Sequence, residues 1–243
     1  MDQIFDLSFL LAALAVVVGA IVRGYTGFGS GLVMAPFLAI LWGPVPTVAT
    51  IACLGTLSFF QMARPALPLT SWPDVMPLMV AAVVITPIGT YSLVSLDPMI
   101  VKRIIAGTVL VVALISLRGW TYSGPKGVVP GLVAGTIAAL INGVAAVGGP
   151  PIVLYLMSLP GKAETHRANT VMAMGVVSGV IVFYMWLAGA FDGAAWLRIA
   201  FLVPVNFVGI WVGARLFRLL PGNAFRVIVL WVLVAVSISI LVL

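Results

Sequence analysis

Hydrophobic residues in this sequence form long runs separated by short polar stretches, and these runs define the predicted elements. A bilayer-spanning segment must satisfy its own backbone hydrogen bonds, and the alternation typical of barrel strands is absent, so each run is predicted to be an α-helix. Ten apolar segments follow from the pattern: Leu7 to Val22, Phe28 to Trp42, Val45 to Met62, Val75 to Ser95, Ile100 to Leu117, Val128 to Ile141, Val147 to Leu159, Ala168 to Ala188, Ala195 to Phe217 and Ala224 to Leu243.

The composition excludes a water-soluble globule. Hydrophobic residues make up 63% of the chain and charged residues only 7%, with a mean hydropathy of +1.27. A soluble domain carries about 25% charged residues. We therefore predict a single all-α integral membrane domain over residues 1–243, with about 8–10 transmembrane segments. The acidic N-terminal residues Asp2 and Asp6 favour a retained first span over a cleaved leader.

A glycine-rich break interrupts the hydrophobic pattern at equivalent places in the two halves. The first break is Gly24 to Gly31 (GYTGFGSG) and the second is Gly143 to Pro151 (GVAAVGGPP). Aligning Gly29 with Gly148 also places Gly24 on Gly143. Paired interruptions of short hydrophobic spans are the best sequence indication of a transporter's binding site.

The later parts of the two halves also correspond, since Gly89 and Leu96 align with Gly213 and Leu220. This predicts repeat one over residues 1–120 and repeat two over 125–243, each with five segments. An odd number of segments gives the repeats inverted topology, the arrangement behind alternating access in many secondary transporters. The segments beside the breaks are shorter than the about 20 residues of a normal span, so they are either broken helices or re-entrant hairpins.

Basic residues predict the orientation, because Lys and Arg concentrate on the cytoplasmic side. If every segment crosses and the N-terminus is outside, the outer connections contain only Lys102, Arg103 and Arg198. Both termini are then predicted to be periplasmic. The inner connections hold the other basic residues: Arg23, Arg64, Arg118, Lys126, Lys162, Arg167, Arg215, Arg218 and Arg226.

Several motifs in order along the whole chain resemble the TauE/SafE sulfite exporter family. They are GFGSG after the first span, Pro46 after the next apolar stretch, the run from Asn142 to Pro151 (N-G-x-x-x-x-G-G-P-P), and Arg167-Ala168-Asn169-Thr170. The resemblance implies a permease of the bacterial inner membrane for small sulfur-containing or organic anions, such as sulfite or a sulfonate such as sulfoacetate.

The two breaks suggest how an anion is held. Each break frees backbone groups at membrane depth, which is tolerated only beside protein or a wet cavity. The helix after each break directs unpaired N–H groups and a positive dipole end at an anion. Hydroxyl groups and an amide add donors, and proline suits the first turn of the second helix. The candidate substrate-binding residues are Arg23, Gly24, Thr26, Gly27, Gly29, Ser30, Gly31, Asn142, Gly143, Gly148, Gly149, Pro150, Arg167 and Asn169.

Some of these candidates have a second interpretation. Arg23 is either a guanidinium fork for an oxyanion or an anchor that reaches the headgroups. Asn169 either lines the path or bonds helix to helix. His166 is either a proton relay or, more ordinarily, a cytoplasmic loop residue. Glycine pairs such as Gly209 and Gly213 predict close helix packing.

The remaining chemistry narrows the function to transport. No Ser-His-Asp set, paired carboxylates or metal cluster is apparent, so an enzyme is not predicted and no cofactor is expected. Cys53 has no partner for a disulfide. The basic residues are dispersed, which argues against nucleic acid as a partner. The expected partners are a small anionic substrate and the lipid bilayer, and a homo-oligomer is compatible with the sequence.

The prediction is a small-anion exporter that works by alternating access. Acidic residues fall in loops or at segment ends, so no proton carrier is evident in the spans. An interior-negative potential drives an anion outward with about 2.3 kcal/mol per charge per 100 mV. The alternatives are an importer or channel for an inorganic anion such as sulfate or thiosulfate and, from other classes, a membrane enzyme or an assembly subunit.

Overall fold

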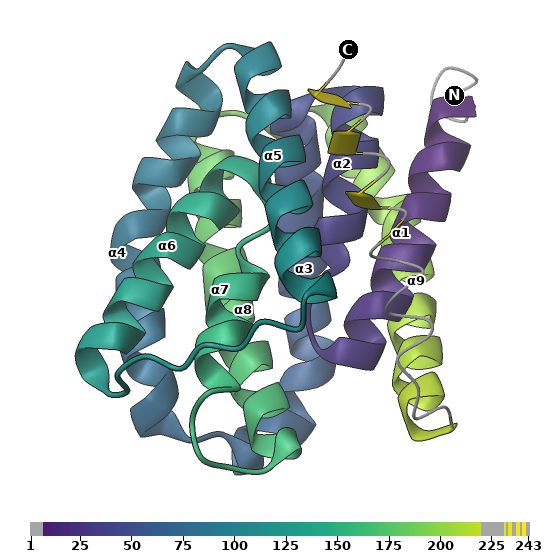
Figure 1. Cartoon of the computed structure of the whole chain (residues 1–243). Coiled ribbons are helices and arrows are strands. Elements are labelled where there is room, and N and C mark those ends of the chain that lie inside the picture. The colour runs from purple at the N-terminus through teal and green to yellow at the C-terminus, as the bar shows by residue number, and fades with distance from the viewer. Residues whose placement is uncertain (1–6, 220–230, 232, 235–236, 239, 242–243) are drawn as a thin grey trace.

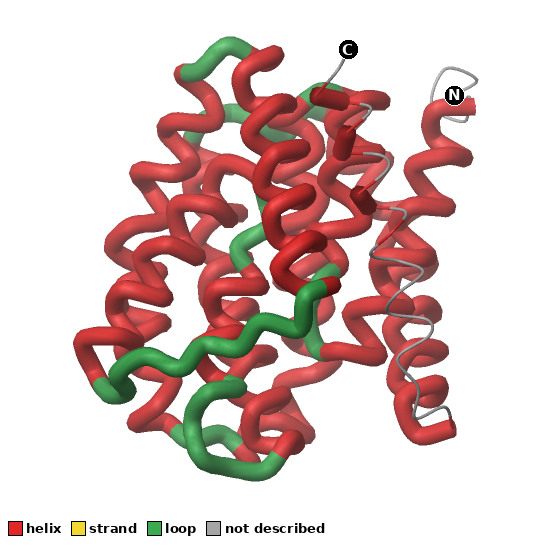
Figure 2. Tube along the Cα trace, viewed as in Figure 1, coloured by secondary structure: helices red, strands yellow, loops and turns green. Residues whose placement is uncertain are grey.

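The computed structural model describes residues 7–219 and positions 231, 233–234, 237–238 and 240–241, and within them all regular structure is helical (Figures 1 and 2). The first nine predicted segments each correspond to one helix, whereas the tenth, Ala224 to Leu243, lies mostly outside the described residues. The helices are α1 (Leu7–Thr26), α2 (Ser30–Trp42), α3 (Pro44–Ala66) with the 3₁₀ turn η1 (Leu67–Leu69), α4 (Trp72–Ser95), α5 (Pro98–Leu117), α6 (Val128–Ala145), α7 (Gly149–Leu156), α8 (Ala163–Leu187) and α9 (Gly193–Leu219).

Seven of the described helices are long and apolar enough to cross a membrane. The two exceptions, α2 with 13 residues and α7 with 8, are the helices that follow the breaks. At 1.5 Å per residue they are about 20 Å and about 12 Å long, less than the about 30 Å of bilayer hydrocarbon. The seven long apolar helices make this a multi-pass membrane protein, and α2 and α7 are each too short to cross the hydrocarbon alone.

The long helices form two outer pairs around a central pair. Figure 1 shows α1 beside α9 on one side and α4 beside α6 on the other, with the central pair α3 and α8 and the short helix α7 between them. Glycines permit the close approach within the outer pairs. Gly213 of α9 packs against the Ile21 carbonyl of α1. Gly89 of α4 packs against α6, where a Cβ atom added to Gly89 would lie 2.8 Å from the Leu140 carbonyl oxygen. The predicted role of Gly209 and Gly213 in helix packing is confirmed.

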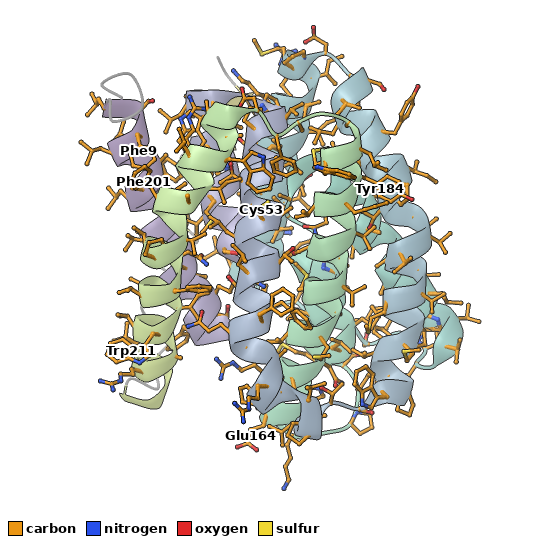
Figure 3. All side chains as sticks on the ribbon, turned by 180° about the vertical axis from the view of Figure 1, so that it is seen from behind. Phe9, Cys53, Glu164, Tyr184, Phe201 and Trp211 are labelled. Carbon is orange, nitrogen blue, oxygen red and sulfur yellow. The ribbon has the colours of Figure 1, made fainter. Side chains whose placement is uncertain are left out.

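The acidic residues of the described chain stand at helix starts, and two of them cap a helix. Asp97 Oδ1 accepts a hydrogen bond from Met99 N (2.7 Å), and Asp192 Oδ1 accepts one from Ala195 N (2.6 Å). A carboxylate suits this place because the first N–H groups of a helix are unpaired and the dipole is positive there. Glu164 lies in the first turn of α8, at one end of the bundle in Figure 3.

The outer surface of the bundle is apolar. Large hydrophobic side chains on α1, α4, α5 and α9 are exposed, among them Leu10, Val84, Val111 and Trp211. A soluble monomer rarely exposes contiguous apolar patches of this kind. The surface suits contact with lipid, whereas Cys53 on α3 is buried inside.

Candidate functional site

The first break is shorter than the sequence indicates. Helix α1 continues through Gly24 to Thr26, because Gly27 N still donates to the Arg23 carbonyl (2.7 Å). Gly27 and Gly29 then take positive φ values of 87° and 88°, which only glycine adopts readily. Thr26 Oγ1 accepts from Phe28 N (3.2 Å) and lies 2.6 Å from the Phe28 carbonyl oxygen, so its hydroxyl holds the break together.

The second break is closed by an asparagine. Helix α6 continues through Asn142 and Gly143 to Ala145, and Ala146 follows with a left-handed φ of 57°. Asn142 Oδ1 accepts a hydrogen bond from Gly148 N (2.9 Å), which ties the start of the next helix to the end of α6. Figure 2 shows this short loop within the height of the bundle rather than at its ends.

The two breaks meet inside the bundle. A Cβ atom on Gly31, in the first turn of α2, would collide with the Ala146 carbonyl. A Cβ atom on Gly149, at the start of α7, would stand 3.2 Å from the Phe28 ring. Both helices begin directly at their break, as expected, with Ser30 and Gly149 as first residues. Residues more than a hundred positions apart thus build one region.

A small cavity lies where the breaks meet. About 20 Å³ is open to the centre of a water molecule, room for about one bound water. The lining combines one guanidinium, two hydroxyls and an amide with apolar side chains. Its residues are Arg23 from α1; Gly29, Ser30, Gly31 and Leu32 from the first break and α2; Ile51 and Ala52 from α3; Asn142, Ala146, Val147, Gly149 and Pro150 from the second half; and Met174, Ser178 and Ile181 from α8.

Arg23 places a charge against this cavity. The side chain is only 4% exposed, so it does not act as an anchor extended to the surface. Its Nη1 and Nη2 donate to Ser30 Oγ at 3.4 Å and to the Gly55 carbonyl at 3.3 Å, longer than typical N–H···O bonds. Its buried Nε has no hydrogen-bond partner within the described part of the chain. The guanidinium therefore retains unused capacity to donate.

The helix ends beside the cavity are unequal. The N-terminus of α2 presents backbone N–H groups from Ser30, Gly31 and Leu32. The N-terminus of α7 reads Gly149-Pro150-Pro151, and proline has no N–H, so this end offers fewer donors than the sequence comparison of the breaks suggests. Donors from the first half thus outnumber those from the second half.

Seven of the predicted site residues line the cavity, and seven do not. Arg23, Gly29, Ser30, Gly31, Asn142, Gly149 and Pro150 are lining residues. Gly24, Gly143 and Gly148 instead allow close packing: Gly148 faces the Ala138 carbonyl and Asn142, and Gly24 faces the Ile210 carbonyl. A side chain at Gly148 would therefore disturb the break itself rather than occupy the cavity. Thr26 and Gly27 shape the first break.

Arg167 and Asn169 lie next to the site on α8, and their side chains form hydrogen bonds to neighbouring parts of the fold. Arg167 Nη2 donates to the Gly24 carbonyl (2.8 Å), and its Cγ lies 3.0 Å from an added Cβ on Gly27. A cation at this point suits the negative end of α1. Asn169 Oδ1 accepts from Ser71 N (2.8 Å), just before α4. Asn169 thus bonds one element to another, which is the second of its two predicted roles.

Sequence reasoning did not single out the contribution of α3 and α8. Ser178, Met174 and Ile181 reach the cavity from α8, and Ile51 and Ala52 reach it from α3. These residues lie within regular apolar helices, where no break or motif marks them. Their only sequence signal is the small residue pair Gly175 and Gly179 beside Ser178, and the first of these packs against Phe59.

The described lining of the cavity contains no carboxylate. The described acidic residues Asp74, Asp97, Glu164 and Asp192 all lie outside its lining. Among the described residues there is also no group of His, Cys, Asp and Glu side chains arranged to hold a metal ion. The site therefore presents a buried cation, hydroxyls and helix N–H groups without a fixed anion.

One of three comparisons with known proteins gives a match. The sequence model described as sulfite exporter TauE/SafE matches residues 11–240, which is nearly the whole chain and includes both breaks. The search of curated proteins and the search of solved structures give no match. A match over this length shows the family and with it a membrane transporter of sulfite-type anions. The chain belongs to the sulfite exporter TauE/SafE family.

Proposed function

We propose that this protein exports a small sulfur-containing or organic anion, such as sulfite or a sulfonate, across the bacterial inner membrane and binds it at the cavity between the breaks. The observation that carries this proposal is the buried guanidinium of Arg23, which lines the cavity and faces no carboxylate there. A charge inside a membrane domain is costly and marks a functional site. Guanidinium matches an oxyanion through paired N–H groups.

The pairing of helices supports an inverted repeat. In Figure 1, α1 begins at the upper end of the bundle and α6 at the lower end, so the two run in opposite directions. Helix α1 packs on α9, and α6 packs on α4, while α3 packs on α8. If each helix of the first half is exchanged with its counterpart in the second half (α1 with α6, α3 with α8, α4 with α9), the same three contacts result. Such symmetry favours alternating access, in which one site faces each side in turn.

The size of the cavity indicates a closed state. It has room for about one water molecule, whereas sulfite and sulfonates have several non-hydrogen atoms. Binding therefore requires the walls to separate, and the two breaks are the places where backbone hydrogen bonding is already interrupted. This is the behaviour expected of a carrier rather than of an open channel.

The positive charge of the site supports outward movement of an anion, driven by the membrane potential. A negative interior drives an anion outward with about 2.3 kcal/mol per charge per 100 mV. The lining has no carboxylate that would carry a proton with the substrate. Export therefore proceeds downhill without a coupled proton.

A flux measurement tests the proposal. Proteoliposomes loaded with radioactive sulfite should lose it faster when a potassium gradient and valinomycin make the interior negative. Arg23→Gln should reduce this efflux by at least about tenfold, because an interaction with a charged group is worth about 1.5–3 kcal/mol. Arg64→Gln, on the exposed end of α3, is the matched control and should transport normally.

Three results would contradict the proposal. Unchanged efflux in Arg23→Gln would remove this residue from the site. Efflux through the unaltered protein that rises with sulfite concentration without saturation would indicate a channel. Transport that proceeds only inward would favour an importer.

A further inference from the structure

The second half of the chain adds few polar groups to the cavity. Helix α7 begins with two prolines after Gly149, so its first turn lacks two N–H donors. The side-chain amide oxygen Oδ1 of Asn142 already accepts a hydrogen bond from Gly148 N. Among the described lining residues of this half, the only other polar side chain is Ser178 on α8.

Ser178 and Arg23 both lie beside Gly55 of α3. A Cβ atom placed on Gly55 of α3 would stand 2.7 Å from Ser178 Oγ and 3.5 Å from Arg23 Nη1. The Gly55 carbonyl is also the acceptor of Arg23 Nη2. Glycine at position 55 thus leaves the space in which a hydroxyl from α8 and a guanidinium from α1 approach each other.

The hydroxyl of Ser178 is not used by the fold. The side chain is only 4% exposed, yet it makes no hydrogen bond to any other residue that the structure describes. Several other hydroxyls in the spans bond to their own helix, as Ser58 does to the Leu54 carbonyl and Thr170 to the His166 carbonyl. The Thr86 and Thr90 hydroxyls also lack a partner among the described residues, but neither residue lines the cavity. Because Ser178 lines the cavity, its hydroxyl is free to bond to whatever occupies that space.

We propose that Ser178 donates a hydrogen bond to the transported anion and selects a head group with three oxygens over a carboxylate. The inference rests on the function proposed above. A guanidinium group binds two oxygens that lie in its plane. A carboxylate has only two oxygens, so the guanidinium can bind both of them. The third oxygen of a sulfite or sulfonate points out of that plane and needs a donor from another helix. Ser178 on α8 supplies one at the cavity that Ser30 of α2 also lines.

The energetic reason is that an unmatched donor penalises the wrong ligand. When a carboxylate occupies the cavity, the Ser178 hydroxyl stays buried without a partner. Sites built to hydrogen-bond one group discriminate strongly against ligands that lack it. A hydrogen bond to a charged group accounts for about ten- to hundredfold in affinity.

The experiment measures dissociation constants of the purified full chain in detergent by isothermal titration with sulfite, methanesulfonate and acetate. Ser178→Ala removes a single oxygen atom. We expect this variant to raise the dissociation constants of sulfite and methanesulfonate by about tenfold or more. The dissociation constant of acetate should stay within about twofold of its value for the unaltered protein. The matched control is Ser92→Ala on α4, whose hydroxyl bonds to the Ile88 carbonyl (2.9 Å) and lies outside the cavity. It should bind all three anions normally.

Arg23→Gln separates this inference from the proposed function. If Arg23→Gln abolishes sulfite binding while Ser178→Ala binds like the unaltered protein, the role of Ser178 is wrong and the site stands. Equal weakening of sulfite and acetate in Ser178→Ala overturns selection by head group. Normal sulfite binding in Arg23→Gln, or no binding of any probe to the unaltered protein, overturns both. Melting curves of each variant establish that it is folded.

Discussion

Gly213 lies so close to Gly24 that a Cβ atom on Gly213 would stand 3.0 Å from the Gly24 Cα atom. The same relationship occurs on the other side of the bundle, where a Cβ atom on Gly89 would stand 3.1 Å from the Gly143 Cα atom. Gly24 and Gly143 each stand on the helix that leads into a break. The two crossings therefore fix the helices that carry Arg23 and Asn142, the residues immediately before these glycines.

Adding a methyl group at a crossing should destabilise the protein. In Gly24→Ala the new Cβ would collide with the Ile210 carbonyl, and backbone cannot move aside as a flexible side chain does. We expect a loss of about 3 kcal/mol in unfolding free energy, measured as a lower melting temperature in detergent. Gly179→Ala is the control, because an added Cβ there has nothing within 4 Å. Similar melting of both variants would contradict the packing role.

Much of this arrangement follows from the sequence. The apolar runs predict the described helices, because a membrane span must be helical and its ends are marked by proline, glycine or charge. The alignment of Gly24 with Gly143 and of Gly89 with Gly213 identifies four residues that form the two crossings. Repeated glycines are informative here because each replaces a side chain that would prevent contact between two backbones.

Other parts of the site depend on tertiary contacts that no local pattern contains. Ser178 sits in an ordinary apolar helix, and its place at the cavity comes from the packing of α8 on α3. Thr26 looks like a ligand in the sequence, yet the local geometry uses its hydroxyl to close the break. Asn169 likewise is engaged by Ser71. A polar residue near a break thus has two possible partners, and only the folded chain shows which one it meets.

Replacing Asn142 by aspartate should preserve the fold but impair transport. The aspartate retains an acceptor for Gly148 N, so the second break keeps its closure. It also introduces a negative charge into the lining, where it repels an anion and competes for the guanidinium of Arg23. We expect sulfite efflux from proteoliposomes to fall by at least about tenfold. Normal efflux in a folded Asn142→Asp would show that the substrate does not reach this wall.

Arg167 should affect the rate of transport more than the affinity for the anion. Its Nη2 holds the Gly24 carbonyl at 2.8 Å and does not line the cavity. Arg167→Met keeps much of the length but loses this bond at the end of α1. We expect a maximal efflux rate reduced by about fivefold with KM within about twofold, whereas Arg23→Gln should raise KM. The concentration dependence of efflux distinguishes them, and a large rise of KM in Arg167→Met would make it a direct ligand.

The end of the bundle that carries Arg118 and Lys126 should face the cytoplasm, because basic residues are retained on that side. Cys53 is the single cysteine, so a Cys53→Ala background allows one reporter at a time. Ser123→Cys lies in the loop after α5 with the basic residues, and Ser95→Cys lies at the opposite end, where α4 finishes. In intact cells an impermeant maleimide should label Ser95→Cys alone, and both should react after permeabilisation. The reverse pattern would place that end of the bundle in the periplasm and contradict the predicted orientation, whereas the potential would still drive the anion outward.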